Sequence, residues 1–145
     1  MSKNSLFLLA VIFALFALSL FVISRPKPSP VPSPTTVTFV AQENSGGEVD
    51  VKVTPLVLKA GEKPQFEIEF NTHSVELDFD ISQIASLTDE DGNSDTSSTW
   101  EGSPPGGHHR SGTLIFTAPL IQTKSVNLTI RDISGVSKRE FTWQL

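Results

Sequence analysis

The three histidines are the side chains of this 145-residue sequence best suited to bind a metal ion. His73, His108 and His109 all lie beside glycine- or asparagine-containing segments that read as turns, where binding residues concentrate. Neutral imidazole is a ligand for Cu and Zn, and a carboxylate such as Asp78 could complete a site. If the two turns share one end of the fold, we expect His73 and at least one of the other two to converge.

Local geometry limits this hypothesis. Adjacent residues of a regular strand point to opposite faces, so His108 and His109 would face one ion only where the backbone is irregular. The alternative is that one imidazole caps the loop by hydrogen bonding while the other is solvated. Metal binding would weaken in acid, because a protonated imidazole has no lone pair to offer.

A second candidate is a calcium loop, in which oxygen ligands recur at alternate positions. These residues are Asp89, Asp91, Asn93 and Asp95. However, Gly92 is misplaced for an EF-hand, and the twelfth residue is Trp100 instead of glutamate. A polar hairpin turn around Asp91-Gly92 is the interpretation we prefer.

Other candidate chemistry is sparse. Trp100 is followed by Gly102 and two prolines, so it is either an exposed platform for a sugar or peptide or a ring that closes one end of the core. Arg110 is the other candidate binding residue outside the metal site. The sequence has no GxSxG elbow, phosphate-binding glycine loop, recognisable acid/base pair or cysteine. We therefore expect no enzymatic activity.

Apolar residues recur at every second position through most of the chain after residue 37, which predicts strands with one buried and one wet face. The residues predicted to face inward are Val49, Val51, Val53, Phe66, Ile68, Phe70, Val75, Leu77, Phe79, Leu114, Phe116, Val126, Leu128, Ile130, Phe141, Trp143 and Leu145. A further strand is predicted over 37–40, and only 81–87 could hold a short helical turn.

Turns rich in glycine, proline, asparagine or serine separate these strands. They are predicted at 60–64, 71–74, 91–93, 104–107 and 134–135. About seven short strands joined by such turns are typical of an immunoglobulin-like antiparallel β-sandwich. The predicted fold is therefore all-β, with this sandwich at residues 37–145 preceded by a single N-terminal transmembrane helix.

The predicted domain is strongly acidic. It contains all sixteen acidic residues but only eight of the eleven basic ones, because Lys3, Arg25 and Lys27 precede it, so its net charge is −8 with neutral histidine. Such a surface repels phosphate backbones. Nucleic acid is therefore excluded as a partner, whereas cations and basic partners are compatible with it.

The N-terminal segment has the length of a membrane span. Residues 4–24 carry no charge, and 6–23 are almost entirely Leu, Phe, Ala, Val and Ile. About 20 apolar residues cross a bilayer, whereas a cleavable signal peptide has an apolar region of about 7–15. We predict that residues 1–24 are a transmembrane anchor, or an uncleaved signal, in the cell membrane.

The spacer supports a single-pass protein whose C-terminal domain lies outside the cytoplasm. Positive charges on the two sides of the span are nearly balanced, so they hardly decide its orientation. Residues 25–36 contain RPKPSPVPSP, with proline at every second position, which favours an extended polyproline II conformation. Such a linker would hold a domain clear of a lipid or wall surface.

Three segments resemble recurring segments of an uncharacterised group of membrane-anchored or secreted prokaryotic β-sandwich proteins. They are FNTHSVELDFDI (70–81), WEGSPPGGHHRSGTLIF (100–116) and LTIRDISGVSKREFTWQL (128–145). The resemblance implies location and fold only. The chain is more loosely similar to periplasmic CopC-like copper-resistance domains, but it lacks their Met-rich ligand segment and free histidine terminus.

Two functions are compatible with these observations. The first is a membrane-tethered binding or interaction module at the cell envelope, whose partner is an unknown envelope protein or small ligand. The alternative is an extracytoplasmic Cu or Zn binding or delivery domain that uses the histidines.

The predicted topology is testable with a reporter fused after Leu145. We expect the reporter to be active outside the cytoplasm and to stay in the membrane fraction, because an uncleaved apolar span holds the chain there. Fractionation and N-terminal sequencing measure this. Recovery of a soluble form that lacks residues 1–24 would contradict the anchor.

Overall fold

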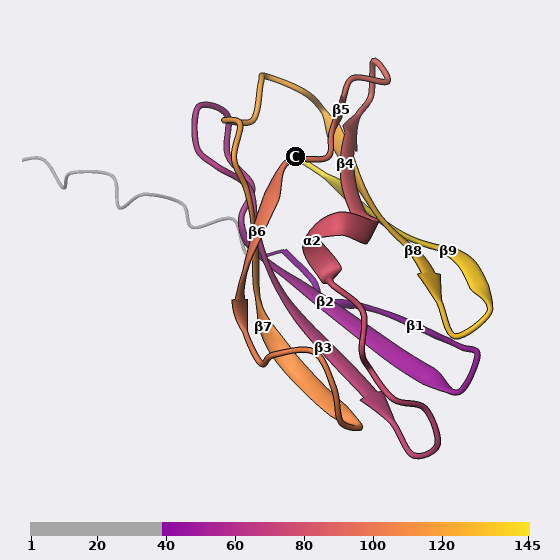
Figure 1. The fold of residues 1–145 in the computed structure, drawn as a ribbon. Coiled ribbons are helices and arrows are strands. Elements are labelled where there is room, and N and C mark those ends of the chain that lie inside the picture. The colour runs from indigo at the N-terminus through magenta and orange to yellow at the C-terminus, as the bar shows by residue number, and fades with distance from the viewer. Residues whose placement is uncertain (1–38) are drawn as a thin grey trace, which may run out of the picture. The chain divides into compact units, whose positions relative to one another are not determined.

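Two antiparallel sheets make up most of the described chain (Figure 1). Period-two alternation in the long strands puts their apolar side chains in the core. The structure, a computed structural model, describes residues 39–145, which belong to one compact unit. The elements are β1 (Gln42–Gly46), β2 (Val49–Val57), β3 (Gln65–Thr72), α2 (Ile81–Ile84), β4 (Ala85–Asp89), β5 (Ser94–Asp95), β6 (Ser98–Gly102), β7 (His109–Phe116), β8 (Ser125–Ile133) and β9 (Val136–Gln144). One sheet has the order β1-β2-β3-β7-β6 and the other β5-β4-β8-β9. The predicted all-β class is confirmed, and the two sheets fit a β-sandwich.

The predicted anchor at residues 1–24 and linker at residues 25–36 lie outside the described residues. Among residues 39–145, no helix combines the length and apolar character that a membrane crossing requires.

The core contains most of the residues predicted to face inward. Alternating side chains of β2, β3, β7, β8 and β9 are buried, which confirms the predicted pattern in these strands. They are Val49, Val51, Val53, Phe66, Ile68, Phe70, Leu114, Phe116, Val126, Leu128, Ile130, Phe141 and Trp143. The Phe66 ring packs against Phe116 and Trp143, with centroid distances of 6.1 and 5.5 Å, and thereby joins the two sheets.

The predicted strand over Val75, Leu77 and Phe79 is wrong, because residues 73–80 form a loop. The alternation of burial survives, with Leu77 buried and Glu76 and Asp78 exposed. Among residues 39–145 the loop has no regular partner strand. The Leu77 N–H donates to Gly107 O, and the carbonyls of Leu77 and Phe79 accept hydrogen bonds from the Arg110 side chain. In this segment, apolar alternation therefore indicates which side chains are buried, but it does not indicate a strand paired in a sheet.

The strand predicted over 37–40 is also wrong at the described Phe39 and Val40, since β1 begins at Gln42. Gln42 pairs with Val53, so an extension of β1 to Val40 would bring it opposite Pro55. Proline has no N–H for the ladder, and the β2–β3 register shifts at this point. The Val40 carbonyl instead accepts a hydrogen bond of 2.9 Å from the Trp143 indole.

Sequence periodicity missed β1, β4, β5 and β6, and it wrongly placed one residue of the last strand. β1 is a polar edge strand joined to β2 by Gly47 and Glu48, which both have positive φ, as two-residue hairpin turns of type I′ require. The predicted helical turn is present as α2, and Asp80 caps its N-terminus by accepting a hydrogen bond from the Ser82 N–H. Leu145 follows β9 and is 43% exposed, so its predicted burial is wrong.

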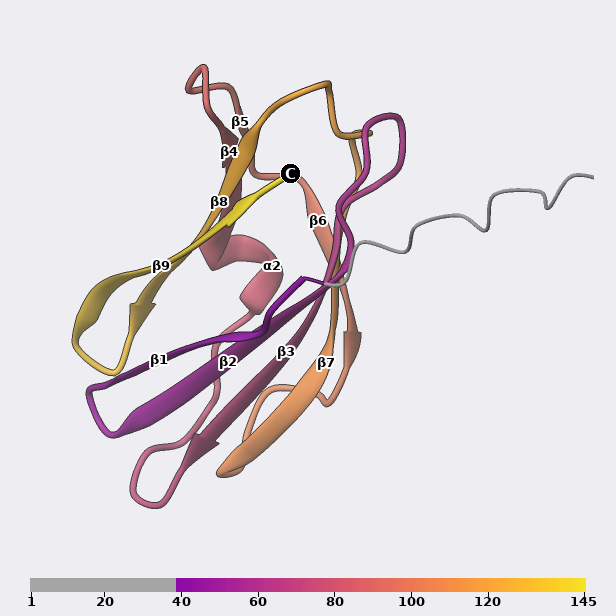
Figure 2. The ribbon, with the colours of Figure 1, turned by 180° about the vertical axis from the view of Figure 1, so that it is seen from behind.

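A fully buried arginine joins the two sheets at one end. Arg139 of β9 donates hydrogen bonds to the carbonyls of Ile133, Gly46 and Val49. The Ser134 hydroxyl donates to the Gly47 carbonyl across the same contact. The β1–β2 and β8–β9 hairpins therefore lie against each other, as both views of the ribbon show (Figure 1, Figure 2).

Burial in β3 gives a matched pair of stability predictions for a chain of residues 35–145, which we expect to unfold cooperatively. Phe70→Ala should lower the free energy of unfolding by about 3–5 kcal/mol, because it removes a fully buried ring. Glu69→Ala should change it little, because the Glu69 contact with Lys52 is partly exposed. Phe79→Ala should cost less than Phe70→Ala, since Phe79 is only half-buried. Chemical denaturation measures all three, and equal effects at positions 69 and 70 would contradict the burial pattern.

Candidate functional site

The histidines lie at the start of β7 and the end of β3. These strands are antiparallel neighbours, and Asn71 of β3 is in register with His109 of β7. His73 follows the last residue of β3. The Thr72 hydroxyl accepts hydrogen bonds from the N–H groups of Ser74 and Val75, which turns the chain immediately after His73. We call the exposed side chains of Asn71, His73 and His109 the histidine rim.

The structure brings His73 and His109 together at the rim, as the turn positions predict. Their ring centroids are 6.4 Å apart, and the rings are nearly perpendicular. His109 Nδ1 lies 2.8 Å from Asn71 Oδ1. A carbonyl oxygen only accepts hydrogen bonds, so His109 carries its proton on Nδ1 and leaves Nε2 free to bind a cation.

His108 and Asp78, the other two predicted metal ligands, are not part of the histidine rim. The His108 carbonyl accepts from the Thr72 N–H, but its exposed side chain precedes the first residue of β7 and is adjacent in sequence to His109. Asp78 is exposed on the loop of residues 73–80. Within residues 39–145, no group of three or more histidine, aspartate or glutamate side chains is arranged to hold a metal ion.

Arg110 has a role inside the fold that the sequence did not reveal. It is only 3% exposed, and its Nη1 donates to the carbonyls of Leu77 and Phe79 at 2.9 and 2.7 Å. Its guanidinium lies 5.0 Å from the centre of the Phe79 ring and 5.9 Å from that of Trp100. Burial lowers the pKa of the guanidinium, and the negative charge of Asp80 opposes this shift. Arg110 therefore fixes the loop that follows His73.

Trp100 also contributes to this inner contact. It is half-buried in β6 and packs against the core, with its ring 6.5 Å from that of Phe70. Its indole N–H donates to the Ser103 carbonyl at 2.9 Å. One edge of the ring fills the space where Gly102 and Gly112 meet, and an added Cβ at either glycine would lie within 3 Å of it. These contacts agree with a tryptophan that closes one end of the core.

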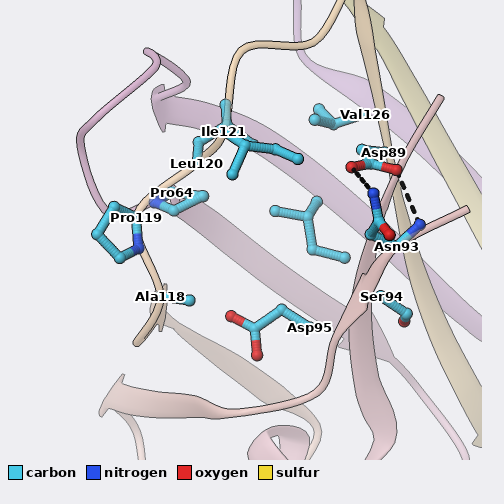
Figure 3. A pocket seen from close by; sticks show the side chains of 11 residues that line it. Pro64, Asp89, Asn93, Ser94, Asp95, Ala118, Pro119, Leu120, Ile121 and Val126 are labelled. Carbon is cyan, nitrogen blue, oxygen red and sulfur yellow. Dashed lines mark hydrogen bonds between the residues drawn. The ribbon is translucent and has the colours of Figure 1, made fainter. Parts of the chain in front are cut away.

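The predicted calcium residues occupy a hairpin turn between β4 and β5. Asp89 Oδ1 accepts from the N–H groups of Asp91 and Asn93. Its Oδ2 accepts from the Asn93 side-chain amide, and Figure 3 shows both contacts between Asp89 and Asn93. The hydrogen bond from the Asn93 side chain is the main cause that lowers the Asp89 pKa. Both carboxylate oxygens of Asp89 are thus used within the turn, as in the polar hairpin that we preferred.

At the end of the sandwich opposite the histidine rim lies a hollow that the sequence pattern did not indicate. It has a volume of about 180 Å³ and open access to solvent. Apolar side chains form most of its wall: Pro64, Leu87, Ala118, Pro119, Leu120, Ile121 and Val126 (Figure 3). We call it the apolar hollow. Ile121, at its edge, is 55% exposed.

Backbone pairing holds the wall of the apolar hollow in place. Leu120 exchanges two hydrogen bonds with the neighbouring loop, since its N–H donates to Glu62 O and its carbonyl accepts from the Gly61 N–H, both at 2.8 Å. The Phe116 N–H donates to Pro64 O at 3.0 Å. The Ala-Pro-Leu-Ile run after β7 was the available sequence feature, but it has no strand period and gives no sign of what faces it.

One polar group in the hollow has an unmet hydrogen-bonding capacity. Asp95 Oδ1 accepts from the Ser97 N–H at 2.8 Å, whereas Oδ2 is buried and has no hydrogen-bond partner among residues 39–145. The carboxylate extends from β5 toward the Ala118 side of the hollow (Figure 3). A buried acceptor without a donor is unfavourable, so a donor brought in by a ligand would relieve this cost.

Comparison of the chain with protein-family models, curated proteins and solved structures finds no match. The features that bear on function are the histidine rim at one end of the sandwich and the apolar hollow at the other.

Proposed function

We propose that this chain is a membrane-tethered binding module that presents an immunoglobulin-like β-sandwich outside the cytoplasm. In this proposal residues 1–24 anchor the protein, residues 25–36 are a stiff spacer, and residues 37–145 bind the partner. The observation that carries the binding role is the apolar hollow with its unpaired carboxylate oxygen.

Strand order supports the immunoglobulin-like class. In such domains one sheet has the order A-B-E-D, and the other has F between C and G. Taking β2 as A and continuing along the chain gives β2-β3-β7-β6 for the first sheet, with β1 added at its edge. The second sheet then has the order C′-C-F-G. The likeness concerns topology alone, because the chain has no cysteine for the disulfide and no tyrosine for the tyrosine corner.

The wall of the hollow supports binding of an apolar group. Ligand sites are concave, mostly apolar, and carry a few polar groups that fix orientation. The apolar hollow has this composition, and its small volume matches a single side chain more closely than a whole cofactor. Because backbone hydrogen bonds fix the loops on both sides, the hollow is formed before a partner arrives.

The negative charge of Asp95 supports a ligand whose apolar group ends in a cation. Asp95 contributes a carboxylate to a mostly apolar environment, where charge attraction is stronger than in water. The terminal carboxylate torsion is soft, so Oδ2 can turn toward a donor. Lysine combines an apolar stem with a cationic head. We therefore propose a basic polypeptide of the cell envelope, with an inserted lysine side chain, as the partner.

A pair of small probes tests this proposal on residues 35–145, once cooperative unfolding of that chain is established. Butylammonium reproduces a lysine side chain, and butyrate has a similar stem with the opposite charge. Butylammonium should shift the amide NMR signals of Leu87, Ser94 and Ile121 at millimolar concentration, whereas butyrate should not. Asp95→Asn should weaken butylammonium binding by about 5–10-fold, because it removes the charge and keeps the shape.

The outcomes separate the parts of the proposal. Equal binding of both probes would contradict the role of Asp95. Absence of shifts around the hollow with either probe would contradict the assignment of this surface as the binding site. Asp91→Asn is the matched control, since it removes an exposed charge from the adjacent turn and should leave the shifts unchanged.

A further inference from the structure

We propose that His73 and His109 form a surface site for one divalent transition metal ion, with Cu²⁺ bound most tightly. This site lies at the opposite end of β7 from the apolar hollow, because β7 begins at His109 and the wall of the hollow begins two residues after Phe116. The inference does not depend on the proposed binding of a basic partner.

Ring geometry carries the inference. A metal ion lies about 2.0–2.1 Å from an imidazole nitrogen and therefore about 3.2 Å from the ring centre, so two imidazoles that share one ion have ring centroids about 4.5 Å apart in a cis arrangement and about 6.4 Å apart in a trans arrangement. The observed separation of His73 and His109 is 6.4 Å, at the upper end of this range. Both side chains are exposed, so small rotations can adjust their nitrogens without disturbing the core.

Asn71 supplies the support that metal-binding histidines usually have. Such a histidine donates its other ring N–H to an oxygen, which fixes the tautomer and the orientation of the ring. The Asn71 carbonyl oxygen accepts from His109 Nδ1 at 2.8 Å. Because the backbones of Asn71 and His109 are paired in the β3–β7 ladder, this contact is held by both strands.

The surroundings determine the class of metal. Asp50, the next residue in the cross-strand row, pairs with Asn71. It is therefore two strands from His109, and among residues 39–145 no third histidine, aspartate or glutamate side chain completes a metal-binding group with these two. Two imidazoles with the remaining positions open to water favour Cu²⁺ over Zn²⁺ in affinity. The net negative charge of the domain raises the local cation concentration.

His108 provides a matched control within the same segment. It neighbours His109 in sequence and is also exposed, but it lies in the bend before β7, and the ring close to His73 is that of His109. The proposed site therefore needs His73 and His109 and not His108. Nonspecific copper binding to surface imidazoles would make no such distinction.

The test is a titration of the full chain, without an affinity tag and in a non-ionic detergent, with Cu²⁺ alone. Calorimetry should find one site per chain, weakened at least tenfold by His73→Ala or by His109→Ala and changed less than twofold by His108→Ala. Electron paramagnetic resonance should detect two coordinating imidazole nitrogens in the wild type and one in each weakened variant. Asn71→Ala should weaken binding about threefold to tenfold, since it frees the ring of His109.

Three results would overturn the site. They are the absence of a one-to-one binding event, an equal loss of affinity in His108→Ala, and a wild-type spectrum with one imidazole nitrogen. All three histidines are exposed, so circular dichroism of the variants should match that of the wild type.

Discussion

The histidine rim depends on a buried cation that has no ion-pair partner within the described part of the chain. Arg110 lies in the interior among carbonyl oxygens and aromatic faces, and its Nε has no hydrogen-bond partner in residues 39–145. Such a charge is costly to bury, and strong hydrogen bonds to carbonyl oxygens offset much of the cost. The two carbonyls belong to Leu77 and Phe79, so Arg110 fixes the path of the loop of residues 73–80. The turn at His73 leads directly into this loop.

A second arginine has the same physical role elsewhere. Arg139 is also buried, it has no carboxylate partner among the residues that the structure describes, and it donates to carbonyls from the β1–β2 and β8–β9 hairpins. Burial lowers the pKa of its guanidinium, but guanidinium groups remain protonated in proteins. In both places the N–H groups of a guanidinium donate to backbone carbonyls that have left the regular pairing of the sheets. The fold therefore combines an apolar core between the sheets with two buried arginines, Arg110 and Arg139, which hold loops and hairpins by hydrogen bonds to their carbonyls.

The parts of the structure that could be predicted from the sequence are those set by the period-two alternation of apolar residues in strands and by turn-forming residues. The inward positions of β2, β3, β7, β8 and β9 follow from alternation, and the turns at 91–93 and 134–135 follow from their glycine, asparagine and serine residues. Sequence reasoning failed where another interaction decides the backbone. Val75, Leu77 and Phe79 alternate as in a strand, but the Arg110 side chain takes two of their carbonyls. β1 is polar and forms because the Gly47–Glu48 turn folds it onto β2.

The candidate sites were predictable to different degrees. The approach of His73 to His109 follows from two turns at the ends of neighbouring strands, whereas Asn71 as the support of His109 requires the register of β3 and β7. The apolar hollow was not predictable, because its wall combines residues from segments far apart in sequence. Leu87, Asp95 and Ile121 show no common period, and only the folded chain brings them together.

Hydrogen exchange in Arg110→Met tests most directly whether this arginine holds the loop beside the histidine rim. Methionine keeps the apolar bulk but removes the donors to Leu77 and Phe79. The account predicts that the amides of Leu77 and Gly106 will exchange at least about tenfold faster than in the wild type, while those of Val51 and Leu128 keep their protection. Unchanged exchange at Leu77 and Gly106, or an equal loss of protection at all four amides, would contradict a specific role of Arg110 in this loop.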